Sequence, residues 1–271
     1  MTSLIKTEWL KIRKYPAFWG MAAIVTLSYP GINYLFFRGF KNLMEHGKEK
    51  ATLVMKMLLG NPFTFPEVWH TVAWASSIFV FIPSIVVIMF ITNEYSYKTH
   101  RQNIIDGWSR NQFLAGKLID VLIISLITTA IFVAIALLIG YVNINEGSHN
   151  IWEQSNYIGL FLLQTLSHLS IAFLIAFLFR KAFIALGVFL FYKIAEKILV
   201  LIAMFKANDL GRFLPLEISN RLIPSPAFMG KFDAEGYKNS LALINQHIIY
   251  SIILLIITWT ICFWINKRRD L

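Results

Sequence analysis

A polar, cationic island separates two long apolar segments in the first half of the chain. The island runs from Asn93 to Lys117, and its flanks are WASSIFVFIPSIVVIMFIT and LIDVLIISLITTAIFVAIALLIG. Each flank is long enough to cross a bilayer, because about 20 apolar residues at 1.5 Å rise cover the roughly 30 Å hydrocarbon core. The island is therefore expected at a membrane surface, as a reversal between two spans.

The composition excludes a soluble globular protein. Hydrophobic residues make up 57% of the 271 residues and charged residues only 15%, which predicts an all-α polytopic membrane protein with one transmembrane domain over residues 1–271. The net charge of +10 does not indicate a nucleic-acid partner, because the basic residues lie at loop ends and form no stripe interleaved with aromatic residues. The single cysteine, Cys262, excludes an intramolecular disulfide and a cysteine-based metal cluster.

Six apolar segments are expected to cross the membrane as helices. They cover about residues 17–37, 72–92, 118–141, 157–179, 182–205 and 247–265. Pro30 and Pro83 predict kinks in the first two spans. The sequence Thr64–Glu67 resembles a capping box, which predicts that the second helix begins outside the hydrocarbon. The apolar pieces between Lys206 and Gln246 are broken by prolines, and they suit a broken external helical hairpin before the sixth span.

The distribution of Lys and Arg predicts the orientation. An inside N-terminus places 13 of these residues on about 49 cytoplasmic residues and 10 on about 90 external residues. Both termini are therefore expected in the cytoplasm of a multi-pass protein of the cell membrane. Residues 2–15 are expected to form an interfacial helix on the anionic leaflet, with Glu8, Trp9, Lys11 and Arg13 among its polar and aromatic residues.

The island is predicted to contain a helix, a stop and a second helix. Glu94 would lie in the first turn of a helix that reaches Ile105, and Asp106-Gly107 would end it with a left-handed glycine. Ser109 and Gln112 have capping-box spacing, so the next helix is expected to start at Arg110 and to continue into the third span. The alternative is that the island's basic residues only contact lipid phosphates: Lys98, Arg101, Arg110 and Lys117.

Three ionisable residues, Lys193, Glu196 and Lys197, fall at or beyond the midpoint of the fifth predicted span. Each costs at least about 2.5 kcal/mol at bilayer depth, so these side chains should face protein or water. Lys193 and Glu196 are three residues apart and could pair along the helix. The triplet is either a packing or dimer-interface pair or part of a substrate path.

No catalytic motif is present. The sequence lacks a G-x-x-x-x-G-K-[ST] phosphate loop, H-E-x-x-H and G-x-S-x-G, and no His and carboxylate cluster has ligand spacing. We therefore expect no nucleotide site, no metal site and no enzymatic activity in this chain. His168 in the fourth span is interpreted as a packing residue.

The island resembles the first cytoplasmic loop of ABC-2 type permeases, the membrane subunits of type V-like ABC exporters. That loop has an acid after the second span, a Thr-x-Arg element, Ser-Arg, an aromatic residue and a lysine. The matching residues here are Glu94, Thr99, Arg101, Ser109, Arg110, Phe113 and Lys117. Lys98 stands where the family frequently has glycine. The N-terminal E-W-L-K-I-R-K resembles the family's interfacial helix, and the L-P-L-E segment resembles its external hairpin.

The resemblance implies a homo- or heterodimer of six-span subunits, bound to two ATPase subunits that would carry ATP and Mg. The island would be the coupling helix at the ATPase-subunit interface, formed by Glu94, Lys98, Thr99, Arg101, Asp106, Ser109, Arg110 and Lys117. The resemblance implies no particular substrate. The rival hypothesis is a stand-alone channel or secondary carrier that uses the charged residues of the fifth span, although no internal symmetry supports inverted repeats.

Overall fold

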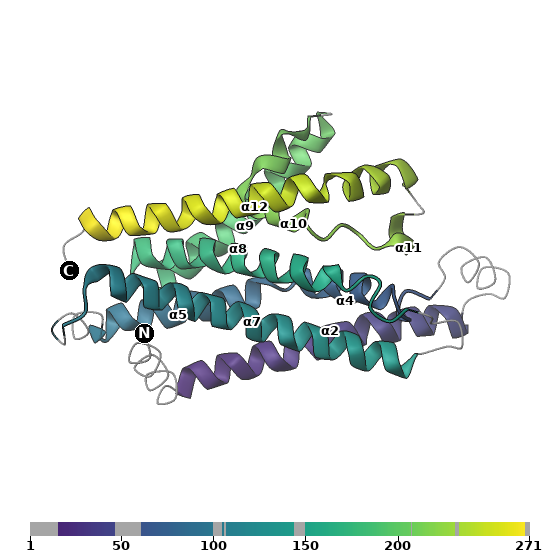
Figure 1. The fold of residues 1–271 in the computed structure, drawn as a ribbon, viewed down its shortest axis with the longest axis horizontal. Helices are drawn as coiled ribbons and strands as arrows, with labels where there is room; N and C mark the ends of the chain where they lie inside the picture. Colours follow the sequence, from purple (N-terminus) through teal and green to yellow (C-terminus); the bar gives the residue numbers. More distant parts are fainter. Residues whose placement is uncertain are drawn as a thin grey trace.

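The computed structural model describes residues 16–46, 61–99, 105, 107–143, 150–206, 208–230 and 233–268. All regular elements in this part of the chain are helical (Figure 1). In chain order they are α2 (Pro16–His46), α4 (Val68–Ser77), α5 (Phe81–Ser96), α7 (Arg110–Val142), α8 (Asn156–Phe179), α9 (Ala182–Phe205), the 3-10 helix η1 (Asp209–Phe213), α10 (Pro215–Asn220), α11 (Ala227–Gly230) and α12 (Ala234–Arg268).

The helix α8 forms the centre of the bundle. In the most apolar stretch of α8, 72% of the residues are buried, compared with 33% in α7 and 22% in α12. The helix packs against α4, α5, α7, α9, α10 and α12. Its polar residues are accommodated inside the protein. Ser170 accepts a hydrogen bond of 3.0 Å from the indole Nε1 of Trp259 on α12. Ser170 therefore contributes to the packing of α8 against α12.

The long helices carry apolar side chains on the outside of the bundle. Exposed fractions are 67% for Leu138 on α7, 90% for Phe183 on α9 and 62% for Ile256 on α12. Because a soluble protein rarely exposes large apolar surface, this pattern indicates contact with lipid. Three helices, α7, α8 and α12, are long and apolar enough to cross a membrane, and α4 with α5 forms a fourth candidate bent by 47°.

The structure places several helix ends differently from the sequence analysis. The helix α2 continues to His46, well past the predicted end near residue 37, and α12 begins at Ala234 where the sixth span was predicted near residue 247. These added turns are more polar than the apolar cores of the two helices, so a hydropathy criterion excludes them although the backbone continues as helix. The predicted ends of α7, α8 and α9 agree with the structure within a few residues, apart from the expected cytoplasmic extension of α7.

The bend between α4 and α5 lies three residues before Pro83. Residues 78–80 form a turn, and Pro83 lies in the first turn of α5, where its missing N–H requires no helical acceptor. The capping box predicted at Thr64–Glu67 is wrong. The side chain of Thr64 donates to the carbonyl of Asn61, and Glu67 makes no side-chain cap at the start of α4. Competing turn contacts within residues 61–67 thus replace the predicted cap.

The segment after α9 is broken into short helical pieces, as the sequence predicted. It consists of η1, α10 and α11, after which α12 starts immediately with the capping residue Asp233. The short helix α10 begins with Pro215 at its first position and packs against α8, α9 and α12. This segment is held against the bundle, as its apolar pieces predicted.

Candidate functional site

The first end of the island is formed by the end of α5. Glu94 lies in the last turn of α5, so the prediction that it begins a new helix is wrong. Lys98 adopts φ 55°, the left-handed conformation that ends many helices. The hydroxyl of Thr99 donates to the carbonyl of Glu94 over 3.3 Å and satisfies one of the terminal acceptors. Gly107 has φ 95°, which confirms the predicted left-handed glycine.

Replacing Lys98 with glycine is expected to stabilise the protein by about 0.5–1 kcal/mol. A left-handed non-glycine residue costs about 1–2 kcal/mol, and part of this gain is offset by the larger backbone entropy of glycine in the unfolded state. Tyr97→Gly is the matched control, because Tyr97 is also exposed but has φ −89°. It should lower stability. Melting curves of the purified variants measure both shifts, and equal shifts would contradict the backbone explanation.

The second end of the island is fixed by the predicted capping box. The backbone N–H of Gln112 donates to Ser109 Oγ over 3.2 Å, and the backbone N–H of Ser109 donates to Gln112 Oε1 over 2.8 Å. The helix α7 therefore starts at Arg110, as predicted. In addition, Asn266 near the end of α12 donates to the carbonyl of Arg110 over 2.9 Å. The base of α7 is thus held by its own cap and by α12.

A buried ion triad connects the two ends of the island. Lys117 of α7 is completely buried, and its Nζ lies 2.7 Å from Glu94 Oε1 of α5 and 3.0 Å from Asp120 Oδ2. The same ammonium group faces the rings of Phe90 and Phe113, at 5.0 and 5.5 Å from their centroids. Because both helices contribute charges, the triad fixes α5 against α7 where the island leaves the bundle.

Some residues of the predicted ATPase-subunit interface are therefore buried, and others are exposed or half-buried. Glu94 and Lys117 are buried within the chain and contact each other, whereas Lys98 and Ser109 are exposed and Thr99 and Arg110 are half-buried. Burial corrects the expectation that the side chain of Lys117 is presented at a surface. The remaining predicted residues of the island and of the interfacial helix lie outside the described residues: Arg101, Asp106, Glu8, Trp9, Lys11 and Arg13.

A groove of about 1170 Å³ lies on another part of the molecule and contains the charged triplet of α9. One wall is α9 with Lys193, Glu196 and Lys197, and the opposite wall is the first half of α12 with His247. The floor includes His168 of α8, and the turn between α4 and α5 closes one side. The structure thus brings the triplet together with residues far apart in sequence.

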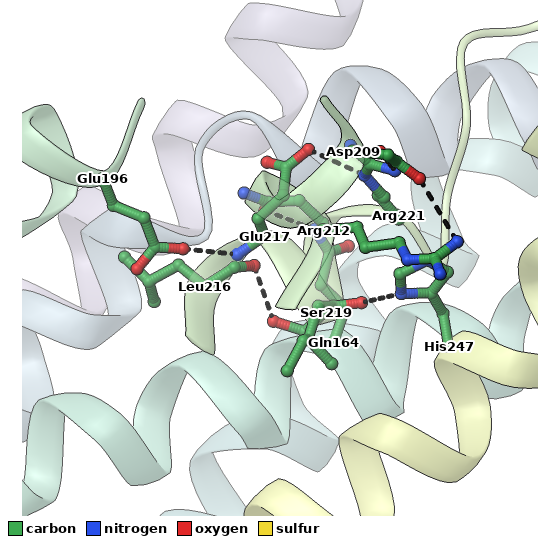
Figure 2. Close-up of polar contacts among 11 residues, drawn as sticks. Gln164, Glu196, Asp209, Arg212, Leu216, Glu217, Ser219, Arg221 and His247 are labelled. Carbon is green, nitrogen blue, oxygen red and sulfur yellow. Dashed lines mark hydrogen bonds and ion pairs between the residues drawn. The ribbon is translucent and has the colours of Figure 1, made fainter. Parts of the chain in front are cut away.

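Glu196 binds a backbone group. It is 4% exposed, and its Oε1 accepts a 2.6 Å hydrogen bond from the backbone N–H of Glu217 in the first turn of α10 (Figure 2). The hydroxyl of Tyr192, one turn earlier on α9, approaches the same carboxylate. The carboxylate therefore satisfies a donor that α10 leaves unpaired at its start.

The lysines of the triplet do not neutralise Glu196. Lys193 places its Nζ 4.0 Å from the centroid of the Phe81 ring, and within the described part of the chain neither Lys193 nor Lys197 forms an ion pair. Of the two partners considered for Glu196, Lys193 and a residue of a neighbouring helix, the structure shows the second, on α10. Glu196 binds α10 because the first turn of this helix offers a fixed backbone N–H donor.

A second polar network lines the same groove. Arg221 donates from Nη1 to Asp209 Oδ1 over 2.8 Å and from Nε to Glu217 Oε1 over 3.1 Å (Figure 2). Asp209 also pairs with Arg212 at 3.2 Å. His247 of α12 contacts the carbonyl of Ile218 through Nδ1 at 3.1 Å. These contacts join η1, α10 and α12 into one unit.

Sequence reasoning missed the partners in both clusters. Asp120 follows Lys117 by three residues, a spacing that places both on one helix face and that could have indicated an internal pair. Glu217 and Arg221 are four residues apart, but a six-residue helix gives no periodicity that predicts them. Within the described ranges no group of three or more His, Cys, Asp or Glu side chains is arranged to hold a metal ion.

Comparison with known proteins gives a family. No curated protein matches the chain. Residues 54–271, which include the island, the buried triad and the whole groove, match the family described as "Protein of unknown function (DUF2705)". This match covers well over half of the sequence, and the chain therefore belongs to the DUF2705 family.

Proposed function

We propose that this chain is the permease subunit of an ABC-2 type exporter, in which a separate ATPase subunit drives substrate across the membrane. Six helical units would be the spans: α2, the α4–α5 pair, α7, α8, α9 and α12. The N-terminus would lie in the cytoplasm, so that the island faces the ATPase. Two such subunits and two ATPase subunits would form the transporter.

The observation that carries this proposal is the rigid connection of the island to the bundle. The exposed part of the island presents Tyr97 and Ile105, which are 71% and 77% exposed. Directly beneath it, the buried ion triad fixes α5 to α7, and α7 continues without interruption for 33 residues. A push on the island would move these helices as a unit, because packed elements shift as rigid bodies.

The test is co-purification with an ABC ATPase, which is sought first in the genes beside this one and expressed together with the chain. We expect the tagged chain to retain the ATPase and the chain alone to hydrolyse no ATP. Ile105→Glu should reduce ATPase retention about 10-fold, the loss expected when a charge is placed at the centre of an apolar contact. Val142→Glu is the matched control, because Val142 is also 77% exposed but lies at the opposite end of α7.

Two outcomes of the co-purification would contradict the proposal. Either no ATPase is retained by the parent chain, or Ile105→Glu and Val142→Glu reduce retention equally. Melting temperatures of both variants show whether each remains folded. ATP hydrolysis by the chain alone would also contradict the proposal.

The groove supports a second candidate, a stand-alone carrier. The observation that favours a carrier is that three ionisable residues of α9 line a cavity of about 1170 Å³. Substrate movement in liposomes that contain only this chain, without ATPase and ATP, would favour the carrier. A requirement for both would favour the permease.

A further inference from the structure

The groove between α9 and α12 is open toward the surroundings of the bundle through an apolar rim. Ile194 and Ile198 of α9 line the groove, although 61% and 51% of their surfaces are exposed, and Ile78 contributes from the α4–α5 turn. In Figure 1, one end of α9 projects beyond α12 and away from the other long helices. The rim thus consists of side chains suited to lipid tails.

The groove is large for a small polar solute. Its volume of about 1170 Å³ exceeds the range of roughly 300–1,000 Å³ typical of sites for drug-sized ligands. Leu190 and Leu243 line it from the two walls. A ligand that fills this space has an extended apolar part.

Two lysines of the groove lining have no ion-pair partner among the described residues, whereas each acidic residue of the lining has a hydrogen-bond or ion-pair partner. Glu196 is bound by the backbone of α10, and Asp233 accepts a hydrogen bond of 2.9 Å from the backbone N–H of Gly236 at the start of α12. Asp209 and Glu217 are matched by Arg212 and Arg221. Lys193 and Lys197 form no ion pair within the described ranges, and they lie one helical turn apart on one face of α9.

Two buried histidines offer further polar contacts. His168 is 5% exposed and His247 is 1% exposed, and the Nε2 atom of each has no hydrogen-bond partner among the described residues. Both line the groove, and His168 lies close enough to Lys193 to interact electrostatically with it. A buried unsatisfied nitrogen is costly, so each of these atoms is suited to a hydroxyl or phosphate group of a ligand.

We propose that this groove binds an anionic phospholipid of the bilayer. Lys193 and Lys197 hold the phosphate, the histidines contact the polar headgroup, and the apolar walls and rim receive an acyl chain. The site itself requires no partner protein. The further step, that such a lipid or a lipid-linked molecule is the exported substrate, rests on the function proposed above.

Lipid retention by the purified full chain tests the site. The chain is reconstituted with equal amounts of phosphatidylglycerol and phosphatidylcholine, transferred to detergent and analysed by native mass spectrometry. We expect retained phosphatidylglycerol, which Lys193→Gln and Lys197→Gln each reduce about 5-fold, because one lysine near an anionic lipid contributes about that factor. Lys206→Gln is the matched control, since Lys206 lies at the exposed end of α9 outside the groove.

The outcomes separate the possible ligands. Equal retention of both lipids, or unchanged retention in the Lys193→Gln, Lys197→Gln double variant, overturns the proposal. Displacement of the lipid by glycerol phosphate at equal concentration also overturns it, because the ligand would then be a soluble anion. Lys193→Arg should preserve retention, which shows that loss in the glutamine variants is not misfolding. Since only this chain is used, absence of an ATPase partner does not affect the result.

Discussion

Replacing Lys117 with methionine is expected to lower the stability of the protein by about 3–5 kcal/mol, the usual cost of leaving a buried charge without its partner. Lys117 is completely buried, and its Nζ contacts both Glu94 Oε1 and Asp120 Oδ2. The substitution keeps most of the side-chain volume, so the loss reports the charge and not a cavity. Denaturation of the purified chain in detergent measures the change.

The control for this substitution is Lys181→Met. Lys181 is exposed at the start of α9, so its replacement should change stability by no more than about 0.5 kcal/mol. Neutralising the two acids with Glu94→Gln and Asp120→Asn in the Lys117→Met background should recover part of the loss. Equal stability of Lys117→Met and Lys181→Met would show that the triad is not a buried ionic contact.

The sequence predicted those features of the fold that depend on neighbouring residues. The start of α7 follows from the local capping box of Ser109 and Gln112, and the turn at Gly107 follows from the steric freedom of glycine. The extents of the helices α7, α8 and α9 follow from continuous apolar stretches. Each of these signals is contained within a few helical turns.

The sequence could not predict contacts whose partners are distant along the chain. Glu94 and Lys117 are 23 residues apart, and charge alone does not distinguish an exposed docking lysine from a buried one. For Glu196 the sequence left two partners open, Lys193 and a residue of a neighbouring helix, and folding brings it to the backbone of α10, 21 residues later. Every residue except proline has a backbone N–H, so the residue type does not show which of these groups will bind a side chain. Hydropathy and spacing therefore cannot predict such contacts.

Replacing Glu196 with leucine is expected to lower stability by about 1.5–3 kcal/mol, the range for a hydrogen bond to a charged group. The leucine cannot accept from the backbone N–H of Glu217, which is left buried and unpaired at the start of α10. Glu196→Gln should cost less, because its side-chain carbonyl can still accept. Denaturation of the parent and the two variants gives the order, and equal losses would contradict a role as acceptor.

A double-mutant cycle then decides whether Glu196 interacts with Lys193 or with α10. In the structure Lys193 lies over Phe81 and Glu196 binds the backbone of Glu217, so Lys193→Met and Glu196→Leu should be additive within about 0.5 kcal/mol. A direct pair would give a coupling of about 0.5–3 kcal/mol, and the double variant would then be more stable than additivity predicts. Additivity would show that Lys193 is not ion-paired with Glu196. The ammonium group of Lys193 could then bind an anionic ligand in the groove.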